Sequence, residues 1–171
     1  MTIKQLSIFI ENKGGTLISV LDLLSKAGIQ IIASTIADTK DYGIYRVLCD
    51  SPAQAYLILK DAGINVQLSD VFALSIDDVP GRAAEAVKEI SDAGVNILYL
   101  YSFLWKGKGV LVFRTDQSEK AKETIMLNKL VFLTEDDWHC CCLCQNEDML
   151  VCIYAMWVRT SIFFEKILFS M

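Results

Sequence analysis

Short apolar runs alternate with amphipathic stretches over the first 136 residues of the chain. In the first half, this pattern predicts the order strand, helix, strand, strand, helix, strand, with strands over residues 5–10, 29–37, 43–49 and 64–68. The first helix has apolar residues at helical spacing on one face, at Leu17, Val20, Leu21 and Leu24. It is expected to end at Ala27-Gly28, because glycine readily adopts the left-handed conformation that closes a helix.

The second helix of this half begins at Ser51-Pro52, where proline suits the first helical position. Its inward face is expected to carry Ala55, Leu59 and Ala62. The same order of elements then follows again, with strands over 71–76, 95–103, 109–114 and 130–133 and helices over 80–93 and 117–127. The first of these helices is expected to bury Ala83, Ala86, Val87 and Ile90.

The two halves are an internal repeat at an offset of 66 residues, with no gap needed. Three glycine pairs fall at this offset, in turns that open a helix, close a helix and form a hairpin: Gly15 and Gly81, Gly28 and Gly94, Gly43 and Gly109. A βαββαβ unit predicts a ferredoxin-like fold of class α+β, an antiparallel sheet with both helices on one face. The sequence therefore predicts two such units, residues 1–69 and 70–136.

The sheet face opposite the helices is predicted to be covered. Residues 97–101 and 110–113 are apolar at both parities, whereas a half-solvated strand would alternate. We expect the other unit or another chain to cover this face. Aromatic residues gather there, at Tyr99, Tyr101, Phe103 and Trp105, and packing explains them better than base stacking, because no RNA-recognition sequence accompanies them.

Charge and composition argue against several functions. The net charge of −5 argues against nucleic acid as a partner. The chain has a single histidine, His139, whereas HExxH-type zinc sites need two and a Ser-His-Asp triad would depend on this one residue, so hydrolytic and metal-based chemistry is not expected. Asp77-Asp78 has no nearby nucleophile and is read as a solvated turn, and Lys106-Gly107-Lys108 as a hairpin tip. We expect no catalytic residues, no cofactor and no metal site.

Residues 137–171 form an apolar, cysteine-rich C-terminal extension of uncertain structure, with five of the six cysteines. Cys141 and Cys144 form one Cys-x-x-Cys pair, with His139 and Cys152 as the remaining possible ligands, but a zinc site usually takes two separated pairs. Thiol oxidation, lipidation and an incidental cysteine-rich segment are the alternatives, and the last is favoured.

The apolar run that begins at Met149 stops at Arg159, short of a membrane span. This run could form a docked helix or strand, a peripheral membrane contact or a poorly packed extension, and the sequence does not distinguish these alternatives. Deletion of residues 138–171 is expected to leave a folded protein. The N-terminus lacks a secretory signal pattern, and we expect a cytoplasmic location with reduced thiols.

The repeated turn-helix-strand segments resemble the ACT domain, whose signature is a D-x-P-G-like turn, an amphipathic helix and a G-x-N-I strand start. The second copy matches closely, with Asp78-Val79-Pro80-Gly81 and later Gly94-Val95-Asn96-Ile97. The first copy has Gly14 in place of proline and Gln30 in place of asparagine. The resemblance covers about residues 3–136 and is to tandem ACT proteins without a catalytic domain.

The resemblance implies an amino-acid ligand held at the turn between the first strand and first helix, and at the contact between ACT units. Its site residues would be Asn12, Gly15, Gln30, Asp78, Gly81 and Asn96. A helix N-terminus with glycine suits the carboxylate of such a ligand, an amide could hydrogen-bond it, and Asp78 could meet its ammonium group. The alternative is structural: Asn12 and Asp78 only cap a helix, and the glycines only ease its start.

The sequence thus leads to a non-catalytic, amino-acid-binding sensor or regulatory protein of amino-acid metabolism. A homodimer is expected, with a metabolic enzyme as a further possible partner and with neither nucleic acid nor membrane. The alternative is a ligand-free structural or regulatory subunit that dimerises with an amino-acid biosynthetic enzyme, similar to the small subunit of acetolactate synthase. Ligand titration separates these two functions.

Overall fold

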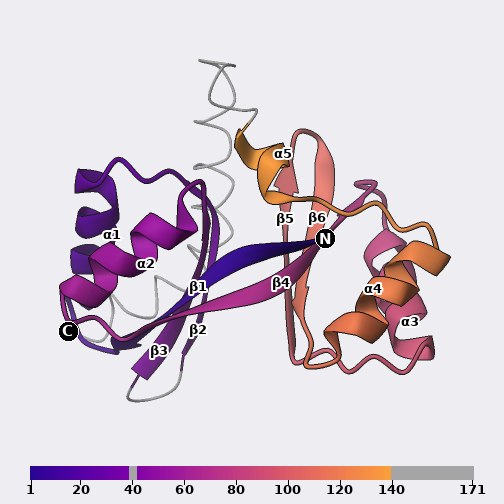
Figure 1. Cartoon of the computed structure of the whole chain (residues 1–171), viewed down its shortest axis with the longest axis horizontal. Helices are drawn as coiled ribbons and strands as arrows, with labels where there is room; N and C mark the ends of the chain where they lie inside the picture. Colours follow the sequence, from indigo (N-terminus) through magenta and orange to yellow (C-terminus); the bar gives the residue numbers. More distant parts are fainter. Residues whose placement is uncertain (39–41, 140–171) are drawn as a thin grey trace. The chain divides into compact units, whose positions relative to one another are not determined.

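The computed structural model describes residues 1–38 and 42–139, which form one antiparallel six-stranded sheet with helices (Figure 1). The strand order is β2-β3-β1-β4-β6-β5. The elements are β1 (Thr2–Glu11), α1 (Thr16–Lys26), β2 (Ile31–Asp38), β3 (Tyr42–Cys49), α2 (Pro52–Asp61), β4 (Val66–Ile76), α3 (Arg82–Asp92), β5 (Tyr99–Trp105), β6 (Lys108–Arg114), α4 (Ser118–Leu127) and α5 (Glu135–His139). The α+β fold class with two ferredoxin-like units is confirmed.

Strand β4 belongs to both repeats. Its first part pairs with β1, from Val66 opposite Ile8 to Phe72 opposite Thr2, and its second part pairs with β6. Beyond the start of β1, the same edge of β4 is continued by residues 131–133, where Leu133 N donates to Ala73 O at 2.8 Å. The sequence predicts two strands here, 64–68 and 71–76. They form one, because Ser69 and Asp70 continue the extended backbone, and the proposed boundary at 69/70 falls inside it.

Each repeat packs its two helices on one face of its strands, as Figure 1 shows for α1 with α2 and for α3 with α4. Val20, Leu24, Ala55 and Leu59 fill the first core. Ala86, Ile90, Ala121 and Ile125 fill the second. The predicted helix faces are thus confirmed in their centres, whereas Ala62 and Ala83 are exposed because they lie at or beyond the helix ends. Gly28 and Gly94 close α1 and α3 with φ of +70° and +72°, as predicted.

The helix-free faces of the two repeats pack on each other. Their shared core includes Ile3, Ala33 and Leu48 from the first repeat and Val71, Ala73, Val110 and Val112 from β4 and β6. The alternate aromatic residues of β5, Tyr99, Tyr101, Phe103 and Trp105, are half-buried against this core. The bare face is thus covered as predicted, and of the two predicted coverings, the other repeat or another chain, the other repeat provides it; the aromatic stretch packs in this core.

Helix α5 extends the packed part of the chain past the boundary expected at residue 136. Trp138 is only 6% exposed and lies against Trp105, with ring centroids 4.8 Å apart. Glu135 Oε1 accepts a hydrogen bond from Lys4 N at 2.8 Å, and Asp137 Oδ2 accepts one from Thr134 N at 2.7 Å. The compact unit runs over residues 1–139. The proposed cysteine ligands Cys141, Cys144 and Cys152, and the apolar run from Met149, lie outside the described residues.

Cys49 makes stability sensitive to alkaline pH. Its thiol is buried in the first core, and burial raises its pKa from 9.0 to about 11. The unfolded chain releases the thiol proton at a lower pH than the folded protein does. The contribution of the buried thiol to the free energy of unfolding is therefore complete below pH 9 and is lost as the pH rises to 11. We expect wild type to lose about 2 kcal/mol more between pH 8 and 11 than Cys49→Ala, measured by urea denaturation. Equal losses in the two proteins would contradict this.

Candidate functional site

Glycine occupies the N-cap position of α1 and of α3. Gly15 and Gly81 adopt φ of +87° and +97°, a region that costs an L-residue about 1 kcal/mol or more. No side-chain hydrogen bond caps either helix. The first N–H group of each helix donates to a carbonyl of the preceding turn, at 3.4 Å in α1 and 3.3 Å in α3, and the next N–H groups, at the positive end of the helix dipole, have no side-chain cap. Each turn is a place where an anionic group can approach the backbone closely.

The acidic residue that precedes each turn is already paired. Glu11 forms an ion pair with Lys13, and the hydrogen bond between them lowers the pKa of Glu11. Asp77 accepts a hydrogen bond from Lys108 Nζ at 3.2 Å and lies 3.7 Å from Arg82 NH2. These exposed pairs shape the turns and contribute little to stability.

Asn12 and Asp78 lie in the turns beside Gly15 and Gly81, and both are exposed. The capping alternative does not describe Asp78, because Gly81 is the N-cap residue and α3 has no side-chain cap. No hydrogen bond or ion pair joins Asp78 to the described part of the chain. Its carboxylate is thus open to a ligand beside the uncapped turn.

Gln30 and Asn96 follow α1 and α3, at the other end of each helix. The backbone N–H of Gln30 donates to Asp50 Oδ1 at 3.2 Å, and that of Asn96 donates to Gln117 Oε1 at 2.8 Å. The 11 residues of α1 span about 16 Å, so Gln30 and Gly15 lie at opposite ends of the first repeat. The same holds for Asn96 and Gly81 across α3. Each repeat therefore brings together the predicted site residues of its turn, but the predicted amide residue, Gln30 or Asn96, lies away from them.

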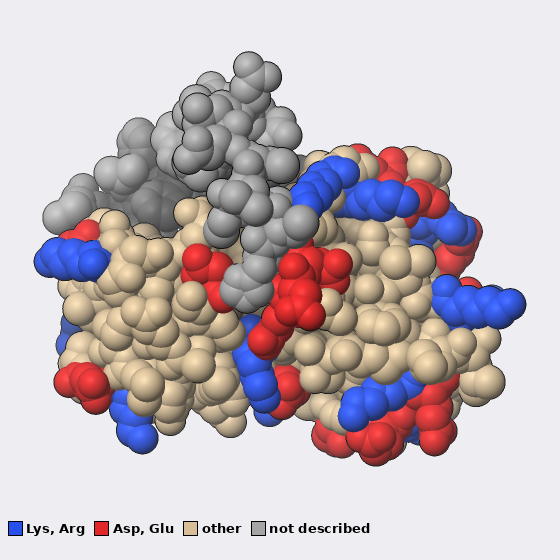
Figure 2. Space-filling view, turned by 45° about the horizontal axis from the view of Figure 1, so that its top comes forward, with Lys and Arg blue, Asp and Glu red and all other residues tan. Residues whose placement is uncertain are grey.

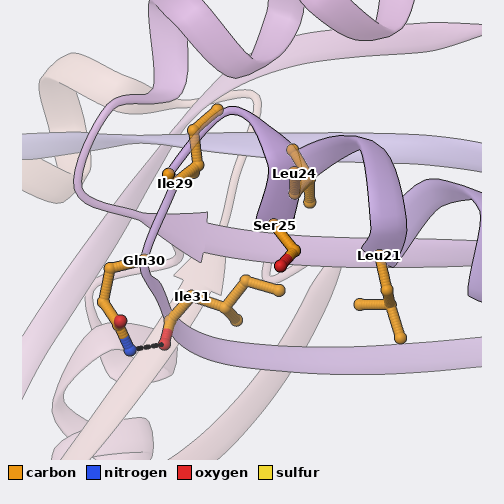
Figure 3. Close-up of a pocket in the computed structure, with 7 residues that line it drawn as sticks. Leu21, Leu24, Ser25, Ile29, Gln30 and Ile31 are labelled. Atoms are coloured by element: carbon orange, nitrogen blue, oxygen red, sulfur yellow. Dashed lines mark hydrogen bonds between the residues drawn. The ribbon is translucent and has the colours of Figure 1, made fainter.

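A pocket of about 420 Å³ lies at the C-terminal end of α1 (Figure 3). Its walls are Leu21, Leu24, Ser25, Gly28, Ile29, Gln30 and Ile31. Of the six predicted site residues, it includes Gln30. No sequence motif marks Ser25 or Ile31, and helical spacing predicts Leu21 as a core residue. Leu21 and Ile31 are only half-buried, so part of each side chain lies on the pocket wall. A smaller hollow between the ends of α3 and α4 is lined by Glu89 and Asp92 among others.

Charges of both signs are interspersed on the face drawn in Figure 2. Within residues 1–38 and 42–139, no group of three or more His, Cys, Asp or Glu side chains is arranged to hold a metal ion. Over the same residues, no helix is long and apolar enough to cross a membrane.

Comparison with known proteins gives the family. Residues 1–141 match the family described as "ACT domain pair". The crystal structure of protein BT0572 from Bacteroides thetaiotaomicron is 38% identical, covers 78% of this chain and 92% of its own, and superposes with a TM-score of 0.74. No curated protein matches the sequence.

More distant structures share the fold. The regulatory subunit of aspartate kinase from Thermus thermophilus, in its ligand-free form, is 14% identical over 72% of this chain and 91% of its own, with a TM-score of 0.54. The corresponding subunit from Thermus flavus is 15% identical over 72% and 90%, with a TM-score of 0.51. On the match over residues 1–141 and the 38% identical structure, this chain belongs to the ACT domain pair family.

Proposed function

We propose that this protein is a non-catalytic regulatory protein that binds an amino acid at the turns before α1 and α3. ACT domains are regulatory modules that commonly bind amino acids. The observation that carries the proposal is the pair of glycine N-caps, Gly15 and Gly81, without side-chain caps. Such a helix start offers several N–H donors and a positive dipole end to the carboxylate of a ligand.

The ligand is held between two copies of the chain. Gln30 lies about 16 Å from Gly15 along α1, which is longer than an amino acid, so one ligand cannot touch both kinds of group within one repeat, and we place the second group on another copy of the chain. A homodimer follows from this proposal. Solved relatives include regulatory subunits of aspartate kinase, and a metabolic enzyme as a further partner is part of the proposal.

Calorimetric titration of the full chain with the twenty amino acids tests the function. We expect at least one of them to bind at sub-millimolar concentration and to stabilise a dimer in sedimentation. No binding by the folded protein would refute the proposal.

Glycine variants test the place of binding. Gly15→Ala and Gly81→Ala add a methyl group and backbone strain to the turns, and Gly63→Ala, at φ +75° after α2, adds the same strain elsewhere. Each variant is expected to lose about 1 kcal/mol of stability. Only a turn variant is expected to weaken amino-acid binding, by about tenfold or more. Unchanged amino-acid affinity in both turn variants would show that the ligand does not bind at these helix starts.

A further inference from the structure

The pocket at the end of α1 is lined without an ionisable side chain. Leu24 is fully buried at its base and Ile29 is 7% exposed, while Leu21 and Ile31 are half-buried at its sides. In Figure 3, the side chains of Leu21 and Ile31 border the same space between the last turn of α1 and the start of β2. The volume of about 420 Å³ lies in the range of small-molecule sites. Its walls fit a hydrocarbon group rather than a charged one.

Polar groups at the pocket stand at its rim. Gln30 Nε2 donates to Ile31 O at 3.3 Å, and the amide of Gln30 lies apart from the side chains of Leu21 and Ile31 (Figure 3). Ser25 is exposed in the last turn of α1. Gly28 follows the helix, where carbonyl groups and the negative end of the helix dipole favour a cation.

The second repeat shows what this helix end accepts. The residues at the seven equivalent positions are Val87, Ile90, Ser91, Gly94, Val95, Asn96 and Ile97, the same chemical types as in the first repeat. There, the ammonium group of Lys120 donates to Gly94 O at 3.1 Å. A Cβ added to Gly94 would lie 3.0 Å from Lys120 Nζ. The second repeat thus places an ammonium group of the chain itself on this glycine.

The first repeat leaves the same place open. The residue equivalent to Lys120 is Gln54, at the same position of α2. No side chain or distant backbone atom lies within 4 Å of a Cβ added to Gly28. The first repeat therefore combines an aliphatic pocket with a free place for an ammonium group, and the second does not.

We propose that the ligand of this protein is an aliphatic amino acid, bound one per chain at the first repeat, with its ammonium group at Gly28 and its hydrocarbon side chain between Leu21 and Ile31. The inference rests on the proposed function and names its ligand class. The carboxylate extends toward the uncapped turn of a second copy. Ligands with a charged side chain are disfavoured because the pocket offers that charge no partner.

The test begins with calorimetric titration of the full chain with leucine, isoleucine and valine, against lysine, aspartate and serine. We expect an aliphatic amino acid to bind at least tenfold more tightly than the other three, at one per chain. Removal of the ammonium group should weaken binding, so 4-methylpentanoate, which is leucine without its amine, is expected to bind at least tenfold more weakly than leucine.

Two variants place the ligand. Ser25→Leu extends a side chain into the pocket, and Gln54→Lys supplies the first repeat with the ammonium group that the second has. Each is expected to weaken binding at least tenfold. Ser91→Leu is the matched control at the equivalent position of the second repeat and is expected to leave affinity unchanged. Thermal melting of each variant confirms its fold, and both test positions are exposed.

The outcomes separate the two proposals. Tightest binding of a charged or hydroxylated amino acid, two ligands per chain, or full affinity in both Ser25→Leu and Gln54→Lys would overturn the inference and leave the proposed function standing. Absence of binding by any of the twenty amino acids would overturn both.

Discussion

Replacement of Trp138 by alanine is expected to lower the free energy of unfolding by about 3 kcal/mol. Trp138 is 6% exposed and packs edge-on against Trp105 at 4.8 Å and beside Phe103 at 6.2 Å. The substitution removes a large apolar side chain from the core shared by the two repeats, and the rigid strands β5 and β6 cannot collapse into the space. Urea denaturation followed by far-ultraviolet circular dichroism measures the change without relying on tryptophan fluorescence.

Two shortened chains provide the control for Trp138. A chain that ends at His139 keeps this side chain and is expected to match the full chain in stability. A chain that ends at Asp137 is expected to be destabilised as much as Trp138→Ala. Deletion of residues 138–171, which the sequence predicts to leave a folded protein, therefore removes a core residue together with the extension. Equal stability of the two shortened chains would contradict the role assigned to Trp138.

The repeat made most of the fold predictable. Gly28 and Gly94 close their helices at the positions where the sequence places the left-handed residue, and Ala55 and Leu59 are buried as their spacing predicts. The fusion of two predicted strands into β4 was not predictable, because pairing partners decide it. Phe72 pairs with both Thr2 and Phe113, and neither partner is near it in sequence.

The residues of the candidate site were predictable from the sequence, but their arrangement in space was not. The motif identifies Gly15 and Gly81 as candidates, and the structure shows that both are N-cap residues of helices without a side-chain cap. Gln30 lies at the far end of α1 because of the length of this helix and the direction of β2. A short sequence motif contains neither kind of information. The position of Lys120 was equally unpredictable from the sequence. Only the structure reveals that its ammonium group lies on Gly94.

Gln5 is the second residue whose replacement should be costly. It is fully buried on β1, where Gln5 Nε2 donates to Tyr99 Oη at 2.7 Å and Tyr101 Oη donates to Gln5 Oε1 at 2.9 Å. Burial raises the pKa of Tyr101, so this hydroxyl stays protonated and remains a donor. The guanidinium of Arg46 stacks over the ring of Tyr99 at 4.1 Å. This network joins β1 of the first repeat to β5 of the second through polar groups inside the shared core.

Gln5→Leu is expected to destabilise the protein by about 3 kcal/mol, because it leaves two tyrosine hydroxyls without their partner in the core. The triple variant Gln5→Leu, Tyr99→Phe, Tyr101→Phe removes both sides of the network at similar volume and is expected to cost less than half as much. Urea denaturation of the single and triple variants measures this difference. A triple variant that is less stable than Gln5→Leu would show that the phenol rings, rather than their hydrogen bonds to Gln5, hold the two repeats together.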